Sequence, residues 1–442
     1  MLERIIIEKL FGYYDYDIRF NDEKVTIITG PNGYGKTTIL RIIKAYANRN
    51  FFLFMVLKYD KITLSFSDNT NIEIKKVNEL PDHQSQVIIK NLTSGNEELF
   101  PDEKWLKDWF RENGRSHYKK TIFQDISDGF ESSNDIEQII QRLRKYYGIR
   151  IRVKKDELPP RGMRRLPELS FPSVPLYNAY LIKEQRLHFL GNESRYIDTD
   201  EQPALFDTID AHARDLKNRM VEVSTEYARK AQGLDTSFPQ RLFEQQNRIT
   251  KITYHSAIQE ISDKQRQLEE FGLSDTLPKT GEIQFEDENA KVLQTFVEDS
   301  RQKLEVFDDI LGRLNSFHQI LQRLLFPNKK IVFSQKTGFY FTTIDTNEEI
   351  PLRLLSSGEQ HQIVMWYELL FKAPKQSLIL IDEPEISLHV SWQDSFIKNL
   401  LEILKIQDIN VIVATHSPQI IGPYWHLVHD LYEEQNHAKL EK

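Results

Sequence analysis

The sequence predicts an α/β fold whose two halves stand at opposite ends of the chain, separated by a long and mainly helical insertion. Two short apolar runs, residues 25–29 and 378–381, are typical of strands buried on both faces of a parallel sheet. The first run leads into a glycine-rich motif and then into residues 39–47, whose apolar residues have helical spacing. Residues 205–326 carry apolar residues seven apart, as paired helices do.

The composition limits the possible functions. The chain has 442 residues, enough for about two to four domains. Its net charge of −8 means that any contact with nucleic acid would use a local basic patch. The absence of cysteine excludes disulfides, thiolate zinc sites and cysteine nucleophiles, and fits a reducing cytoplasm. The first ten residues lack a signal-peptide pattern and no apolar run could span a bilayer, so we expect a cytoplasmic protein without a membrane partner.

The glycine-rich motif, residues 30–38, reads GPNGYGKTT and matches the phosphate-binding pattern G-x-x-x-x-G-K-T. Its glycines let backbone N–H groups approach phosphate oxygens, and the following helix points its positive end at the same anion. We expect Lys36 to reach the β- and γ-phosphates and Thr37 to offer a hydroxyl to Mg²⁺. The alternative, a glycine-rich turn with a surface lysine, leaves the complete spacing unexplained. The residues expected to bind nucleotide here are Gly30, Asn32, Gly33, Gly35, Lys36, Thr37 and Thr38.

Two acidic residues, Asp382 and Glu383, follow the second apolar run. A carboxylate at the carboxyl end of a parallel strand can lie beside a P-loop and hold the water shell of Mg²⁺, the role expected of Asp382. Glu383 would then polarise the water that attacks the γ-phosphate. The alternative is that the acidic pair only forms a turn.

Two further motifs could also contact the phosphates of a nucleotide. Residues 356–360, SSGEQ, form a Ser/Gly loop ahead of a helical pattern, which is an anion-binding arrangement. The apolar run at 410–414 leads into His416, which could hydrogen-bond the γ-phosphate or the attacking water. A lone histidine is more often a satisfied core residue, but its place in this series of motifs favours the functional interpretation.

Together these motifs resemble the ABC-type ATPases of the structural-maintenance, Rad50, RecF and overcoming-lysogenization-defect group. The resemblance implies a P-loop ABC-type ATPase domain split by a helical, partly coiled-coil insertion. It implies that Ser356 and Gly358 form the signature loop, that Asp382 is the Walker B carboxylate, and that Glu383 is the catalytic glutamate. Further implied roles are the switch histidine for His416 and the Mg²⁺-sensing glutamine for Gln185.

The resemblance also implies ATP and Mg²⁺ as cofactors and a particular assembly. The implied Mg²⁺ set is Thr37, Asp382 and Gln185, and the implied catalytic set is Lys36, Ser356, Glu383 and His416. In this family the signature loop does not reach its own P-loop. Two chains pair head to tail, so that each ATP lies between Lys36 of one chain and Ser356 of the other. We therefore expect a homodimer or a higher oligomer held by ATP.

A closer resemblance is to the stand-alone ATPase subunits of Septu-type, PARIS-type and retron-associated anti-phage systems. It rests on LFGYYDYDIRF, YLIKEQRL and LSSGEQHQIVMWYELLF. It implies a slow, regulatory ATPase that senses a trigger or scaffolds a separate nuclease or toxin effector. We find no HNH, P-D…E-x-K or TOPRIM region in the sequence, which agrees with an effector on a separate chain. The alternative is a RecF- or Rad50-like DNA repair or maintenance ATPase. The energy subunit of a transporter is a third, weaker alternative.

Residues 60–66 and 70–77 alternate polar and apolar residues around Asp68-Asn69, which predicts a half-buried hairpin. The middle of the chain carries the remaining expectations. Residues 101–147 have helical patterns, and the basic stretch at 142–165 is either a solvated or intersubunit face or a contact for DNA or RNA. The helical segment is either an arm that leaves the core or a bundle packed on it. We expect four regions: the N-terminal half of the ATPase domain with an antiparallel β layer (1–95), a helical and basic insertion with a return strand (96–200), a helical coiled-coil arm (201–328), and the C-terminal half (329–442).

Overall fold

The computed structural model describes residues 1–21, 23–49, 51–76, 87–100, 178–182, 188–190, 205–273, 283–324 and 328–440. They belong to two compact units. The first unit comprises Met1–Glu184, Leu190–Pro203 and Ala373–Lys442, and the second comprises Gln185–Phe189 and Ala204–Lys372. The basic stretch at 142–165, the predicted helices at 101–147 and Gln185 lie outside the described residues.

A five-stranded parallel sheet forms the centre of the first unit, in the order β16-β3-β15-β14-β8. Its strands are β3 (Val25–Thr29), β8 (Asn178–Ile182), β14 (Ser377–Asp382), β15 (Ile409–Ala414) and β16 (Val428–Asp430). The predicted strands at 25–29, 378–381 and 410–414 are confirmed, and β14 is buried along its whole length. The strand order joins segments from both ends of the chain, which confirms that one α/β domain is split by an insertion.

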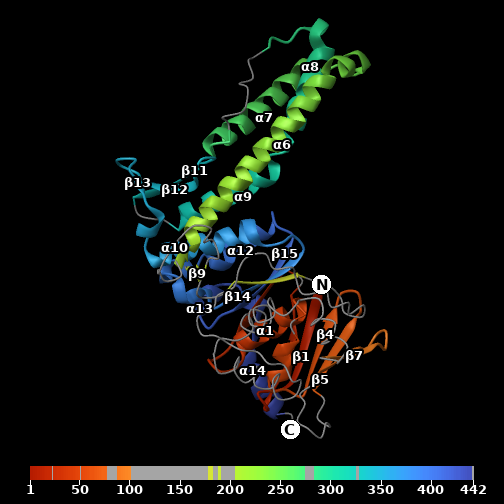
Figure 1. The fold of residues 1–442 in the computed structure, drawn as a ribbon, viewed down its shortest axis with the longest axis vertical. Helices are drawn as coiled ribbons and strands as arrows, with labels where there is room; N and C mark the ends of the chain where they lie inside the picture. The colour runs from red at the N-terminus through yellow and green to blue at the C-terminus, as the bar shows by residue number, and fades with distance from the viewer. Residues whose placement is uncertain are drawn as a thin grey trace, which may run out of the picture. The chain divides into compact units, whose positions relative to one another are not determined.

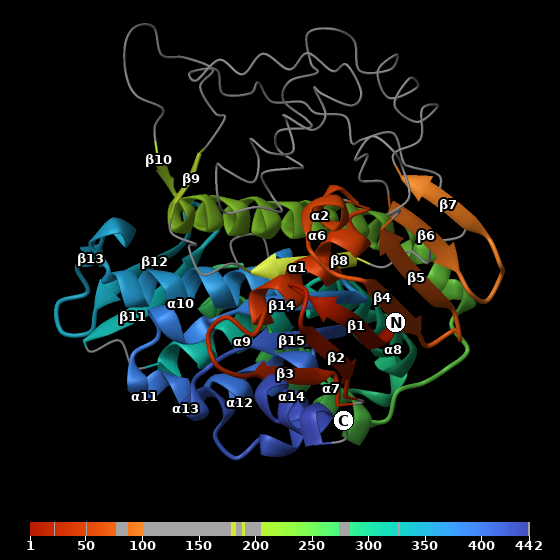
Figure 2. The same cartoon turned by 90° about the horizontal axis from the view of Figure 1, so that it is seen from below.

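The second layer of the first unit is a six-stranded antiparallel sheet, in the order β2-β1-β4-β5-β6-β7 (Figure 2). Its strands are β1 (Leu2–Leu10), β2 (Tyr14–Arg19), β4 (Lys61–Phe66), β5 (Asn71–Lys76), β6 (Val87–Asn91) and β7 (Glu97–Phe100). The predicted hairpin at Asp68-Asn69 is confirmed: Ile62 pairs with Ile74, and Asn69 takes the left-handed conformation. Alternate residues of β4 and β5 are buried, so this sheet covers the core with one face.

Helix α1 (Lys36–Ala47) packs on β8, β14 and β15, and its buried face shares one hydrophobic core with both sheets. The helix predicted at 39–47 is therefore the layer between the two sheets. The other elements of this unit are α2 (Phe52–Val56), η4 (Pro384–Ser387), α11 (Val390–Gln393), α12 (Phe396–Leu404), α13 (Pro418–Ile421), η5 (Trp425–Leu427) and α14 (Leu431–Leu440).

The second unit is dominated by helices α6 (Thr208–Glu244), α7 (Lys251–Glu270), α8 (Ala290–Glu305) and α9 (Asp308–Arg323), with η1 (Asp287–Asn289) before α8 (Figure 1). The helical insertion is confirmed. Helix α8 packs against both α6 and α7. The last heptad run is divided between α8 and α9 by a turn at Val306-Phe307. Across the described residues, no helix is long and apolar enough to cross a membrane.

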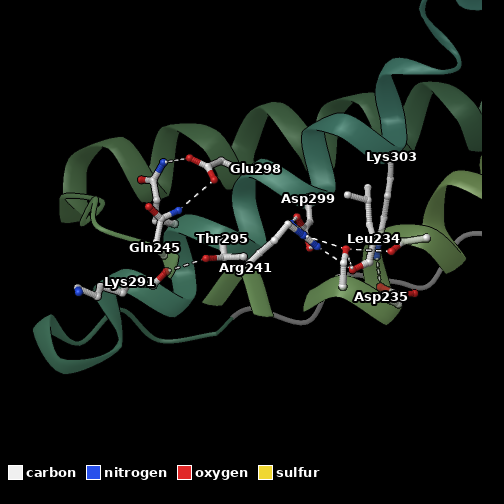
Figure 3. A network of polar contacts seen from close by, with 12 residues as sticks. Leu234, Asp235, Arg241, Gln245, Lys291, Thr295, Glu298, Asp299 and Lys303 are labelled. Atoms are coloured by element: carbon white, nitrogen blue, oxygen red, sulfur yellow. Dashed lines mark hydrogen bonds and ion pairs between the residues drawn. The ribbon is translucent and has the colours of Figure 1, made fainter. Parts of the chain in front are cut away.

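Polar contacts also join α6 to α8 (Figure 3). Asp299 is 4% exposed and accepts a hydrogen bond from the Arg241 guanidinium at 2.8 Å, and Lys303 donates to Asp235 at 2.6 Å. Arg241 also donates to the carbonyl of Leu234 at 2.7 Å. The heptad pattern predicts an apolar interface, and the structure adds an ion pair whose carboxylate, Asp299, is buried between the two helices.

The remainder of the second unit contains strands and the signature helix. Strands β11 (Lys329–Ser334), β12 (Gly338–Thr343) and β13 (Glu349–Ile350) form a sheet, and β9 (His188–Leu190) pairs with β10 (Leu205–Asp207). After η2 (Leu352–Leu354), helix α10 (Ser357–Tyr367) continues into a π-helix, η3 (Glu368–Lys372). A Cβ on Gly338 would lie 1.8 Å from the carbonyl oxygen of Ala213, so only glycine lets β12 pass α6 this closely.

Candidate ATP site

The P-loop connects β3 to α1 and depends on glycine backbone conformations. Gly33 and Gly35 have φ of 86° and 90°, which is the left-handed region. A Cβ on Gly35 would also lie 3.0 Å from the Leu10 side chain. The N-cap residue of α1, Gly35, has no side chain with which to cap the first turn, and that turn contains no acidic residue. Its N–H groups therefore remain available to an anion.

Lys36 is the buried cation of this loop, with 5% of the residue exposed. Its Nζ donates hydrogen bonds to the carbonyl oxygens of Gly30 at 2.8 Å and Pro31 at 3.4 Å. Both acceptors are uncharged carbonyl groups of the same loop. These hydrogen bonds therefore hold the ammonium over the loop without neutralising its charge. A lysine held in this way is suited to phosphate binding.

Thr37 and Asp382, two of the three predicted Mg²⁺ ligands, lie next to each other. The hydroxyl of Thr37 donates to Oδ1 of Asp382 at 3.1 Å, and Asp382 is 8% exposed at the end of β14. Within the described ranges, no three His, Asp or Glu side chains are grouped as a metal site. A hydroxyl and one carboxylate nevertheless fit Mg²⁺, because this ion commonly keeps several waters and takes further oxygens from substrate phosphates.

Glu383 stands at a sharp turn immediately after β14. Its φ of 41° is left-handed and unusual for a residue with a side chain, and its N–H donates to the carbonyl of Ala414 at 2.9 Å. Strands β14 and β15 are in register, with Asp382 opposite Ala414, so the residues after both strands meet at one sheet edge. Oε1 of Glu383 lies 3.9 Å from Nδ1 of His416.

Glu385 is a site residue that the sequence interpretation missed. Its side chain is 5% exposed, and Oε1 accepts hydrogen bonds from the Thr415 hydroxyl at 2.7 Å and the His416 N–H at 2.8 Å. The same oxygen lies 3.0 Å from Nδ1 of His416. The available signal was the second glutamate of DEPE, but only the η4 turn shows that it points back toward β15. Glu385 therefore positions the histidine beside Glu383.

Replacing Glu385 with Gln is expected to lower the ATP hydrolysis rate about 10-fold and to leave ATP affinity unchanged, because the loss of one charge-assisted hydrogen bond costs about 1.4 kcal/mol. Phosphate release and equilibrium nucleotide binding measure the two quantities. Asp394→Asn, at an exposed position in the same unit, is the control. An unchanged hydrolysis rate in Glu385→Gln would contradict the positioning role.

Aromatic residues line the region next to the P-loop. Tyr34 of the loop stacks on Tyr14 with ring centroids 5.1 Å apart, and Tyr14 in turn stacks on Tyr16. Phe11 packs against the core beside Gly35. Three aromatic residues, Phe11, Tyr13 and Tyr14, lie at the turn between β1 and β2. Of these, Tyr13 is the exposed residue, at 62%. It is the ring in this turn that could stack on a nucleotide base, whereas Phe11 and Tyr14 serve packing.

The signature residues belong to the second unit. Ser356 is the N-cap of α10 and forms a capping box with Glu359, so the predicted loop at a helix start is present. The structure thus brings two groups of predicted site residues together. Thr37, which follows Lys36 in the P-loop, contacts Asp382, and Glu383 lies beside His416. The two groups are neighbours because β3, β15 and β14 are adjacent parallel strands. The catalytic and ligand roles assigned to all these residues remain predictions.

Comparison with known proteins defines the class. The chain belongs to the family described as AAA ATPase domain, whose sequence model matches residues 1–421. It is 24% identical to the Retron Ec83 probable ATPase of Escherichia coli over 156 residues, which are 30% of this chain and 28% of that protein. The predicted identity as an ATPase, with a retron ATPase among its relatives, is thereby confirmed.

Other relatives match over shorter regions. UvrABC system protein A of Chlamydia pneumoniae is 35% identical over 71 residues, 16% of this chain and 4% of that protein. Protein ea59 of Escherichia phage lambda is 33% identical over 76 residues, 17% of this chain and 14% of that protein. The match therefore spans less than a third of the length of each of these relatives.

Among solved structures, two Smc head domains align over most of the chain at low similarity. The Pyrococcus furiosus Smc head domain with an extended coiled coil, bound to the C-terminal domain of ScpA, has a TM-score of 0.34 and 14% identity over 95% of this chain and 90% of that one. The SMC head domain from Thermotoga maritima has a TM-score of 0.33 and 13% identity over 97% and 94%.

Proposed function

We propose that this protein is the ATP-binding and hydrolysing subunit of a cytoplasmic anti-phage defence complex, and that it senses a trigger or scaffolds a separate nuclease or toxin. The observation that carries the defence context is the similarity to a retron ATPase. The ATPase part of the proposal is supported by the P-loop with its buried Lys36 and by the meeting of Glu383 and His416 at one sheet edge.

The chain's own residues account for the proposed hydrolysis. The P-loop N–H groups and Lys36 hold the phosphates of ATP, and Thr37 and Asp382 would hold Mg²⁺. When bound, Mg²⁺ supplies positive charge that offsets the charge developing on the phosphates. Glu383 accepts a proton from the attacking water, and His416, fixed by Glu385, orients that water or the γ-phosphate.

Assembly completes the proposed site. Two chains pair head to tail, and Ser356 of one chain contacts the ATP held by Lys36 of the other. ATP then holds the dimer together and its hydrolysis loosens it. Because α10 and helices α6–α9 belong to the same compact unit, a displacement of the signature loop would move that unit as well. This movement is the proposed signal to the effector.

A phage challenge tests the proposal. The gene is expressed with its neighbouring genes in a sensitive host, and plating efficiency is measured for several phages. We expect protection that is lost when the neighbouring effector gene is deleted, and lost again in a Lys36→Ala variant. Protection by this gene alone would contradict the requirement for a separate effector. No protection against any phage, in a host where the complex is assembled, would contradict the defence role.

A second candidate function is that of a DNA repair or maintenance ATPase. The 71-residue similarity to UvrABC system protein A favours it, and the basic stretch at 142–165 would be the DNA contact. ATP turnover by the purified chain, with and without duplex DNA, distinguishes the two functions. Strong stimulation by DNA in the absence of any partner would support this candidate against the defence function.

A further inference from the structure

The signature loop contains a buried carboxylate. Glu359 is 5% exposed and occupies the third position of α10. Its Oε2 accepts hydrogen bonds from the N–H of Ser356 at 2.8 Å and from the hydroxyl of Ser356 at 2.9 Å. A carboxylate here stabilises the start of the helix, but an uncompensated negative charge would repel an ATP phosphate that approaches Ser356.

Lys329 compensates this charge. It begins β11, thirty residues before Glu359, and its Nζ donates to Oε1 at 2.7 Å and to Oε2 at 2.9 Å. Burial alone raises the pKa of Glu359, but the hydrogen bonds from Lys329 and Ser356 outweigh it and hold the pKa below its usual value. The carboxylate is therefore ionised near neutral pH, and the pair carries no net charge.

The Ser356 hydroxyl has a single proton, which it donates to Glu359 in this structure. To donate to a phosphate, the hydroxyl must leave the carboxylate. Glu359 would then keep both bonds from Lys329 and the one from the Ser356 N–H, so the exchange leaves Oε2 satisfied. Without Lys329, a buried carboxylate would depend on Ser356 alone, and releasing the hydroxyl would cost more.

We propose that Lys329 is a positioning residue of the ATP site shared by two chains: it neutralises Glu359, so that Ser356 can turn its hydroxyl to the γ-phosphate bound by a second copy. This inference rests on the head-to-tail dimer of the proposed function. It adds to the site a residue that lies outside all the ATPase motifs and acts through Glu359.

Lys329→Met tests the inference in a Glu383→Gln parent, which is expected to form a stable ATP-bound dimer. Sedimentation velocity measures ATP-driven dimerisation, and a fluorescent ATP analogue measures binding to the single chain. We expect the variant to weaken dimerisation at least about 10-fold, the factor for about 1.4 kcal/mol, with unchanged binding to the single chain. Lys330→Met is the matched control, because Lys330 bonds Asn347 on the surface instead.

Two further variants separate charge neutralisation from folding. Adding Glu359→Gln to Lys329→Met removes the uncompensated charge and should restore dimerisation to within about threefold of the parent. Lys329→Arg keeps the charge and should dimerise like the parent. Normal dimerisation by Lys329→Met, or a double variant as weak as Lys329→Met, would overturn the inference alone. Failure of the parent itself to dimerise with ATP would instead contradict the proposed head-to-tail function, and this inference with it.

Discussion

Replacing Lys36 with Ala is expected to weaken ATP binding by more than about 100-fold. The residue is 5% exposed, and in the described part of the chain its Nζ donates to the carbonyl oxygens of Gly30 and Pro31, so no carboxylate competes with phosphate in these bonds. Losing two charge-assisted hydrogen bonds of about 1.5–3 kcal/mol each accounts for this factor. Titration calorimetry with ATP and Mg²⁺ measures the affinity.

Lys44→Ala is the control for this experiment, because Lys44 lies in the last turn of the same helix, α1, away from the P-loop. It is expected to bind ATP like the unchanged chain. Circular dichroism is used to check that both variants are folded. Tight ATP binding by a folded Lys36→Ala variant would show that residues 30–38 are not the nucleotide site, and the proposed ATPase mechanism would fail with it.

Replacing Glu383 with Gln is expected to lower ATP hydrolysis by about 100-fold or more and to preserve ATP binding. A carboxamide keeps the size of the side chain but cannot accept the proton of the attacking water, a contribution that is typically about 10²–10⁴ in rate. The variant should therefore accumulate as an ATP-bound dimer. Single-turnover hydrolysis and size-exclusion chromatography with light scattering measure the rate and the assembly.

Glu433→Gln, at an exposed position on α14, is the matched control and should hydrolyse ATP normally. Normal turnover by Glu383→Gln would mean that another group is the base. Glu385, whose Oε1 lies 3.0 Å from His416, would then be the next carboxylate to test. A slow Glu383→Gln variant that stays monomeric with ATP would support the base and contradict ATP-driven pairing.

Much of the candidate site could be predicted because its signals are local. A P-loop is one contiguous segment, and the residue types at 30–38 report directly on glycine conformations and a phosphate-binding lysine. Asp382 and His416 were predictable in a similar way, since each follows a continuous apolar run that became a central parallel strand. The hairpin at Asp68-Asn69 was equally local, because alternation and turn chemistry together set its register.

Other features depended on segments that only tertiary structure brings together. The sequence by itself determined the P-loop, the strands that carry the acidic pair and His416, and the presence of a helical insertion. Tertiary structure decided that Glu385 turns back to contact His416. It also decided that Lys329 neutralises Glu359, which lies thirty residues further along the chain. The physical reason is that a buried carboxylate must find hydrogen-bond donors, and packing rather than neighbouring sequence decides which donors those are.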